Sequence, residues 1–272
     1  MVVSGGKSDL DSSRVRIGLL PCWSRGMIRL LPEMKTLSFL LRANVALMFS
    51  GAVCAAESGI NQLSTTEKAA GWRLLFNGQS LVGWRGFKQP GPPATGWEIK
   101  NGNLTCVKSG KGGDLITRDQ FDDFELSWEW SMPPKSNNGV KYFITESRAG
   151  TGAVGHEYQM IDDAIVHGDA LSSTGSFYLV VAPDPKKKVR PFGEWNHSRV
   201  LVHGNHVEHW LNGEKILIYK LGSAAVLEQV AKTKFKGAAG FGTKMRGHIL
   251  LTYHNDECSF RNVKVREIKA AK

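Results

Sequence analysis

Long apolar runs, helical periodicity, internal repeats and cysteine are all scarce in this sequence. Beyond one N-terminal stretch, no segment approaches the roughly 18 apolar residues that a membrane span requires. There is no G-x-S-x-G nucleophile elbow and no glycine-rich phosphate loop. The basic helix or aromatic and basic platform typical of nucleic-acid-binding proteins is also missing. We therefore expect neither a membrane span in the body of the chain nor nucleic acid as a partner.

The excess of positive charge does not alter this expectation. The formal net charge is +10 at pH 7, but residues 1–56 hold seven basic and three acidic side chains and so account for +4 of it. Much of the remainder lies in two runs, Lys186–Lys188 and Lys264–Lys272, which have the composition of a loop and a tail. The charge is spread over segments and does not form a nucleic-acid footprint.

The N-terminal apolar stretch, residues 34–56, has the pattern of a secretory signal peptide. It begins with Met34-Lys35, continues as an apolar run interrupted by Arg42, and ends in small residues. This pattern predicts export to the periplasm or the medium. A lipoprotein site at Cys54 is disfavoured because the bulky Val53 precedes it. The alternative is a disordered basic tail with a short buried helix.

The domain boundaries follow from this interpretation. We expect residues 1–33 to be an upstream extension, residues 57–70 a linker, and residues 71–269 one folded domain. Cleavage after the signal would leave two cysteines, Cys106 and Cys258. Both lie in expected strands, where a disulfide in an exported protein and a pair of buried free thiols are both compatible with the sequence.

From Gly71 onward the pattern is almost entirely β. Asn101-Gly102 and Asn212-Gly213 each separate two apolar runs, which is the strongest short-range hairpin signal because both residues tolerate positive φ. Helix is expected only at 64–70 and 224–232. Short runs with this spacing predict an all-β fold, a two-sheet antiparallel sandwich or a barrel. The expected strands lie in GWRLLFNG, WEIKNGNLTCV, FELSWEWSM, VKYFITE, HEYQMI, SFYLVV, SRVLVHG, HVEHWL, KILIYKL, GHILLTY and CSFRNVKVREI.

The run from Phe124 to Met132 alternates most regularly. Its apolar members occupy every second position, with Glu125, Ser127 and Glu129 between them. Successive strand residues point to opposite faces, so one face belongs to the core and the other carries two carboxylates. That polar face is either the solvated side of an outer sheet or the ligand side of a lectin-like sheet.

Seven segments between Leu75 and Ile268 form a recognisable set. They are LFNGQSLVGW, FELSWEW, SNNGVKYFITE, GHEYQMIDD, TGSFYLVVAP, GEWNHSRVLVHGNHVEHWLNG and FRNVKVREI. In this order they resemble the 3-keto-disaccharide hydrolase domain family. The resemblance implies a concanavalin-like two-sheet sandwich, an exported bacterial protein, and substrates that are sugars oxidised at C3.

One segment departs from the family pattern. Relatives commonly read GHI-x-LQDHG near the C-terminus, whereas this chain reads GHILLTYHND. Thr252 and Tyr253 replace the glutamine and the aspartate, Asn255 replaces the glycine, and His254 is kept. If that aspartate takes part in the reaction of relatives, this chain lacks the group. If it is a turn residue, the change matters little.

The substrates implied by the resemblance need a base. A ketone at C3 acidifies the hydrogen at C2, so a carboxylate or histidine can remove it and the enolate can expel the C1 substituent. Water then adds back. With the resemblance, Glu157 is the leading base, and Gln159, on the same face of its strand, is expected to hydrogen-bond the substrate. The alternative, without a catalytic role, is that Glu157 and Gln159 form a polar pair on an exposed sheet face.

Further groups are candidates for this chemistry. Lys141 would stabilise an enolate, or is an ordinary surface lysine, and the neighbouring Tyr142 is expected to contact the substrate. Glu129 is a second candidate carboxylate, and His254 a candidate acid or base. Direct glycoside hydrolysis would instead need two carboxylates flanking the scissile bond.

Trp195 and Asn196 of the GEWN motif suit a sugar, because a ring face stacks on C–H groups and an amide binds hydroxyls. Alternatively, Trp195 belongs to the core and Asn196 caps a turn. With such an aromatic and polar face but no turnover, the protein would be a non-catalytic carbohydrate-binding module. A structural or partner-binding sandwich is the third possibility.

The three histidines at 203, 206 and 209 do not predict a metal site. A spacing of three on a strand alternates faces, so His206 and His209 point oppositely, and His203 lies across the turn. His209 is expected to point inward. We expect no cofactor. Calcium is the alternative, since sandwich domains often bind it in loops, although no spaced Asp/Asn loop here requires it.

Overall fold

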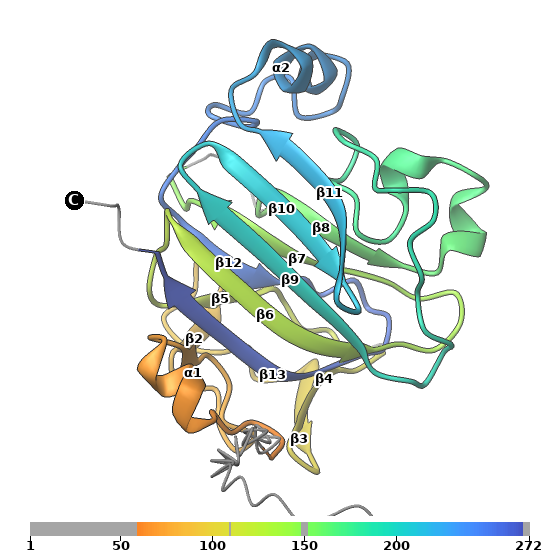
Figure 1. The fold of residues 1–272 in the computed structure, drawn as a ribbon. Coiled ribbons are helices and arrows are strands. Elements are labelled where there is room, and N and C mark those ends of the chain that lie inside the picture. Colours follow the sequence, from red (N-terminus) through yellow and green to blue (C-terminus); the bar gives the residue numbers. More distant parts are fainter. Residues whose placement is uncertain (1–58, 109, 148–151, 269–272) are drawn as a thin grey trace, which may run out of the picture. The chain divides into compact units, whose positions relative to one another are not determined.

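Two antiparallel sheets form the fold in the computed structural model, which describes residues 59–108, 110–147 and 152–268 (Figure 1). The predicted two-sheet antiparallel sandwich is confirmed. The expected extension and signal peptide, residues 1–33 and 34–56, lie outside the described residues.

The larger sheet has eight strands in the order β11-β10-β9-β6-β13-β4-β3, with β1 paired to β13. Its strands are β1 (Arg73–Leu74), β3 (Trp97–Lys100), β4 (Asn103–Cys106), β6 (Phe124–Ser131), β9 (Asn196–His203), β10 (His206–Leu211), β11 (Glu214–Lys220) and β13 (Cys258–Glu267). The smaller sheet has five strands in the order β2-β5-β12-β7-β8. Its strands are β2 (Trp84–Gly86), β5 (Leu115–Thr117), β7 (Asn137–Ile144), β8 (His156–Ile161) and β12 (His248–Leu251).

The core lies between the sheets and follows the period-2 pattern of the strands. In β6 the alternate residues Leu126, Trp128 and Trp130 are buried in the core, while Glu125 and Glu129 lie on the outer face. The same rule orders β8, where the even-numbered residues pack inward. The outer faces of these two strands therefore carry polar side chains, among them Glu125, Glu129, Glu157 and Gln159.

The two Asn-Gly turns form as predicted. Asn101 and Gly102 have φ values of 52° and 76°, and Asn212 and Gly213 have values of 50° and 87°. Positive φ at both central residues is the geometry of a type I′ turn, which matches the twist of the flanking strands. The turns fix the registers of β3 with β4 and of β10 with β11.

Residues 176–181, expected to form a strand, instead form a tight turn. Phe177 and Val181 exchange backbone hydrogen bonds, and Leu179 between them has φ of 64°. This turn and the residue before it bond to the free edge of β8: Gly175 N–H donates to Gln159 O, and Tyr178 N–H donates to Glu157 O. The apolar run therefore protects an edge strand and then turns to bury Phe177 and Val180.

Helices are few, as expected: α1 (Thr65–Ala69), α2 (Ala224–Ala231) and two 3₁₀ turns, η1 (Asp163–Val166) and η2 (Ala170–Ser172). No helix among the described residues is long and apolar enough to cross a membrane. Helix α1 lies within the expected linker and begins with a capping box formed by Ser64 and Glu67. Glu67 also pairs with Lys264 of β13.

Cys106 and Cys258 lie directly opposite each other on β4 and β13, and both are free and buried. Of the two interpretations that the sequence allowed, the structure has the free thiols. Burial raises the pKa of the Cys106 thiol to about 12. The backbone N–H groups of His254 and Asn255, which lie against this thiol, oppose that rise.

Candidate active site

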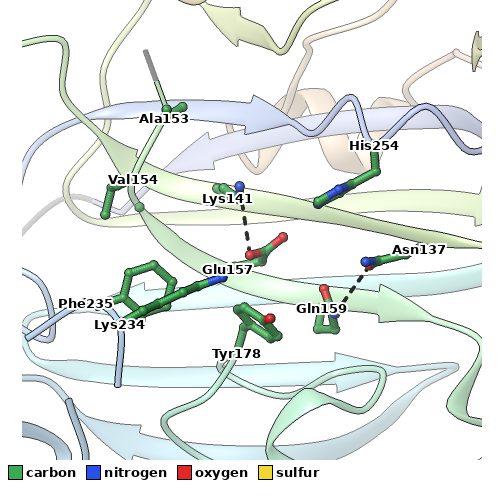
Figure 2. A pocket seen from close by; sticks show the side chains of 12 residues that line it. Asn137, Lys141, Ala153, Val154, Glu157, Gln159, Tyr178, Lys234, Phe235 and His254 are labelled. Atoms are coloured by element: carbon green, nitrogen blue, oxygen red, sulfur yellow. Dashed lines mark hydrogen bonds and ion pairs between the residues drawn. The ribbon is translucent and has the colours of Figure 1, made fainter. Parts of the chain in front are cut away.

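A pocket of about 360 Å³ opens on the outer face of the five-stranded sheet (Figure 2). Strands β7 and β8 supply its floor, and four connecting segments supply its walls. Its volume is in the range usual for small-molecule sites, which is roughly 300–1,000 Å³. The lining residues are Asn137, Lys141, Gly152, Ala153, Val154, Gly155, Glu157, Gln159, Tyr178, Lys234, Phe235 and His254.

Glu157 lies at the centre of this pocket and is buried. Its Oε2 atom is 3.9 Å from Nζ of Lys141, the residue opposite it on β7. Its Oε1 atom has no hydrogen-bond partner within the described part of the chain. Burial raises the pKa of Glu157, and the positive charges of Lys141 and Lys234 oppose that rise. The result is a carboxylate with a higher proton affinity than one in water.

Gly139 makes the space that this carboxylate occupies. It pairs with Gln159 across β7 and β8, and a Cβ atom built on it would overlap Oε1 of Glu157 and lie 3.0 Å from its Cδ. A glycine inside a strand often marks such a close approach. The Gly139 position in the SNNGVKYFITE motif is therefore explained by the side chain that crosses it.

Gln159 and His254 border the pocket on the far side from Lys234 (Figure 2). Gln159 Nε2 donates to Asn137 Oδ1 at 3.4 Å, so two amides lie side by side. His254 is at the exposed rim. Partial desolvation lowers its pKa, and the charge of Lys141 adds to the effect, which favours the neutral imidazole. Together these groups offer several hydrogen-bond donors and acceptors to a ligand.

Tyr178, Lys234 and Phe235 form a wall that we did not predict from the sequence. Lys234 Nζ lies 4.9 Å from the ring centroid of Tyr178 and 5.3 Å from that of Phe235. Tyr178 is brought here by the turn at the edge of β8, and the other two by the segment after α2. The only sequence signal was the TGSFYLVVAP motif, which contains Tyr178. Lys234 and Phe235 lie outside every motif.

Tyr142 lies in the core and not in the pocket. It follows Lys141 on β7, so it points to the opposite face of the sheet. Its hydroxyl group bonds to the hydroxyl of Tyr219 and, at 3.2 Å, to Nε2 of His209. His209 is buried and also bonds Gly175 O through Nδ1 at 2.9 Å, so the expected inward histidine is confirmed.

Three further candidates do not line the pocket: Glu129 on β6, Asn196 at the start of β9, and Trp195 just before it. Glu129 accepts hydrogen bonds from Arg261 Nε at 2.6 Å and from Asn262 Nδ2 at 2.8 Å. The ring of Trp195 is covered by the Arg261 guanidinium, 4.0 Å from its centroid. Asn196 is buried, and its Oδ1 accepts hydrogen bonds from two neighbouring groups. Asn196 thus stabilises the adjoining loop, which agrees with the predicted alternative that it caps a turn.

The departure from the family pattern leaves the pocket's own groups in place. The Tyr253 hydroxyl donates to Val107 O at 3.1 Å, and its ring packs against Trp97. That side chain points away from the pocket, which is lined by the next residue, His254. Thr252 is buried beside Gly139, whose carbonyl accepts its N–H at 3.0 Å. Tyr253 itself therefore does not line the pocket.

Among the residues that the structure describes, no group of three His, Cys, Asp or Glu side chains is placed to hold a metal ion. His206 is paired with Glu208 at the surface while His209 is buried, so the predicted divergence of these two histidines is confirmed.

Comparison with known proteins relates residues 71–266 to one family. Residues 71–266 match the family described as the 3-keto-alpha-glucoside-1,2-lyase-like domain. A similar protein from Bacteroides thetaiotaomicron, named 3-keto-disaccharide hydrolase, is 29% identical over 257 residues, which cover 82% of this chain and 86% of that protein.

Two crystal structures from Parabacteroides distasonis have the same fold. Both are named as candidate glycosyl hydrolases. The first is 30% identical, covers 78% of this chain and 100% of its own, and superposes with a TM-score of 0.70. The second is 22% identical, covers 72% of this chain and 99% of its own, and gives a TM-score of 0.56.

Proposed function

Because this chain belongs to the 3-keto-alpha-glucoside-1,2-lyase-like domain family, we propose that it cleaves glycosides whose sugar carries a ketone at C3. The names of its relatives support a glycoside hydrolase. The finer assignment, a reaction by elimination and hydration, is our proposal. The observation that carries it is Glu157, a buried carboxylate with a raised pKa in a pocket of the right size.

The reaction begins with transfer of the C2 proton to the Glu157 carboxylate. The electron pair of the C2–H bond forms an enolate with the C3 ketone. When the enolate collapses, the C1–O bond breaks, the leaving oxygen takes the proton from the Glu157 carboxyl group, and a C1=C2 double bond forms. Water then adds its oxygen to C1 and a proton to C2, so the net reaction is hydrolysis.

The single carboxylate in the pocket favours this route over direct hydrolysis. Glycosidases that act directly use two carboxylates about 5–10 Å apart, one on each side of the scissile bond. Among the described lining residues, Glu157 is the one acidic side chain. A base that removes a proton next to a ketone needs no second carboxylate, but it does need a donor for the enolate oxygen.

Other lining residues have suitable chemistry for the remaining roles. Lys141, 3.9 Å from the carboxylate, would donate to the enolate oxygen. His254 at the rim, where the neutral imidazole is favoured, would hydrogen-bond a hydroxyl group of the reacting ring. The amides of Gln159 and Asn137 would bind sugar hydroxyls. We keep Glu129, on the other sheet, as the competing carboxylate for the test.

The test is turnover of a 4-nitrophenyl 3-keto-glucoside beside the unoxidised 4-nitrophenyl glucoside. We expect cleavage of the keto substrate alone. Glu157→Gln should lower kcat by about 10²–10⁴-fold, the usual contribution of a general base. The matched variant is Glu129→Gln. Loss of turnover in that variant rather than in Glu157→Gln would overturn the assignment of the base, and cleavage of the unoxidised glycoside would overturn the mechanism.

We also propose that the protein is exported to the periplasm or the medium. The proposal rests on the pattern of residues 34–56, which lie outside the described residues. Determining the N-terminal residue of the mature protein after expression in a bacterial host tests it. Cleavage close to residue 56 would support export, and an intact N-terminus in the cytoplasm would contradict it.

A further inference from the structure

The pocket has two unlike ends, with Glu157 between them (Figure 2). One end is polar and is formed by Asn137, Gln159 and His254. The other is aromatic and is formed by Tyr178 and Phe235, with the ammonium group of Lys234 over both rings. A substrate that fills both ends would therefore meet hydrogen-bonding groups on one side of the base and ring faces on the other.

The geometry of the proposed reaction determines which end of the pocket each part of the substrate occupies. The proton is taken from C2 and the bond broken is at the adjacent C1, so the leaving group extends from the base on one side only. The ring that reacts has a ketone and free hydroxyl groups, which match the amides and the imidazole of the polar end. The leaving group then reaches the aromatic end.

The aromatic end is built to present ring faces. Phe235 stacks on Phe241 with centroids 4.3 Å apart and planes 19° apart, so one of its faces is supported. Tyr178 meets it edge-on, at 6.4 Å and 72°. Flat ring systems stack on such faces, and an aromatic contact of this kind contributes roughly 0.5–1.5 kcal/mol beyond the area that it buries.

His156 holds this wall from beneath. It precedes Glu157 on β8 and points into the core, where Phe241 meets its ring at 5.1 Å. Its Nε2 accepts the N–H of Gly242 at 2.8 Å. Gly242 has φ of 85°, and a side chain there would press on Val230 of α2 at 3.0 Å. The segment that contains Phe235 is thus fixed to the strand that contains the proposed base.

We propose that Tyr178 and Phe235 form a subsite for the leaving group of the substrate, which is a ring with an apolar face, and that His156 positions this subsite through Gly242 and Phe241. The proposal rests on the proposed function, since it assigns the ends of the same pocket. A second sugar ring and an aryl group both have the required chemistry. His156 acts through the wall and does not touch the substrate.

The experiment compares 4-nitrophenyl and methyl 3-keto-glucosides, which differ in the leaving group alone. Phe235→Leu keeps an apolar side chain against Phe241 and removes the ring. We expect it to raise KM for the aryl substrate, relative to KM for the methyl substrate, by about three- to tenfold, the equivalent of one aromatic contact.

His156→Leu removes the acceptor for Gly242 N–H and should change the same ratio of KM values, with a smaller effect on kcat. His156→Gln places an amide oxygen near the position of Nε2 and should restore most of the ratio. The matched control is His209→Gln, which alters another buried histidine that bonds to Gly175 and not to Gly242. We expect it to lower thermal stability and to leave the ratio at the wild-type value.

Two outcomes would overturn the proposal. In the first, Phe235→Leu changes KM equally for both substrates. In the second, His156→Leu lowers kcat equally for both without changing the ratio, as expected from a purely structural role.

If the wild-type protein cleaves neither substrate, the proposed function fails but the subsite is still tested. Binding of 4-nitrophenyl glucoside and methyl glucoside is then compared by ligand-observed NMR. Tighter binding of the aryl glycoside that Phe235→Leu abolishes supports the subsite. Equal binding of the two, or a preference that Phe235→Leu leaves intact, overturns it.

Discussion

Glu157 experiences two opposing influences, and its chemistry depends on their balance. Burial favours the protonated carboxyl group, while Lys141 and Lys234 favour the carboxylate. Because burial has the larger effect, the folded protein binds the Glu157 proton more tightly than the unfolded chain does. This raises the basicity of the side chain and has a cost in stability.

That cost predicts the behaviour of Glu157→Gln. The contribution of the Glu157 carboxyl group to the free energy of unfolding is fully present below the pKa that the group has in the unfolded chain, where it is protonated. That contribution is lost as pH rises through the raised pKa of the folded state. The amide variant does not titrate. We expect its melting temperature to exceed that of the wild type by a margin that grows between about pH 5 and pH 8. A margin that shrinks with rising pH would show that the carboxylate is stabilised in the fold.

Lys141 influences the pH at which kcat/KM falls in acid. The proposed base must be ionised, so kcat/KM should fall as pH drops through the pKa of Glu157. Replacing Lys141 with Met removes a positive charge that lowers this pKa. The acid limb of the kcat/KM profile should therefore move to higher pH. Lys68→Met, a change in α1 far along the chain from the pocket strands, serves as the control and should leave the limb in place. A limb that stays in place in Lys141→Met would contradict the coupling.

At the scale of elements, the site depends on the pairing of β7 with β8. The alternation in HEYQMI predicted correctly that Glu157 and Gln159 share a face opposite His156 and Tyr158, because the strand period alone decides it. The period could not reveal that Glu157 crosses Gly139, since that depends on register between strands. The prediction that Tyr142 contacts the substrate is wrong, and here the strand period alone excludes it, because the neighbouring Lys141 faces the pocket.

Gly139→Ala tests this pairing directly. The added methyl group would overlap Oε1 of Glu157 and displace the carboxylate, and overpacking of this kind usually costs about 1–3 kcal/mol in stability. We expect turnover of the keto substrate to fall by about 100-fold or more, as for a misplaced catalytic group. Gly91→Ala, at a glycine with open space around it, should retain activity. Wild-type turnover in Gly139→Ala would mean that the carboxylate position is not critical.

At the scale of the whole molecule, the sandwich was predictable and the composition of the pocket was not. Turn residues and alternation repeat along the entire chain, so the fold class follows from many weak signals that agree. The pocket wall combines Tyr178 with Lys234 and Phe235, which are more than 50 residues further along. Its position depends on how the segment after α2 folds back, which no local pattern encodes.

The segment before the first strand belongs to the folded unit. Asn61 is buried, its Nδ2 donates to Gly102 O at 2.7 Å, and its Oδ1 accepts Asn262 N–H at 2.8 Å. Asn61→Ala should lower the free energy of unfolding by about 1–3 kcal/mol, because buried groups lose their partners. Urea denaturation measures this loss as a lower midpoint, provided that the slope of the free energy of unfolding against urea concentration is unchanged. Glu67→Gln, which breaks a partly exposed ion pair, should cost less than about 1 kcal/mol. An unchanged midpoint in Asn61→Ala would mean that the segment is dispensable.

The tryptophans are distributed in a way that affects how ligand binding is observed. Trp84, Trp128 and Trp130 are buried, and no tryptophan is among the described residues that line the pocket. The described tryptophans, buried or partly exposed, all lie outside the pocket, so a sugar that fills the pocket should leave the tryptophan emission spectrum almost unchanged. A silent fluorescence titration is thus the expected result for a true ligand, and screening by this signal would discard the substrates it was meant to find.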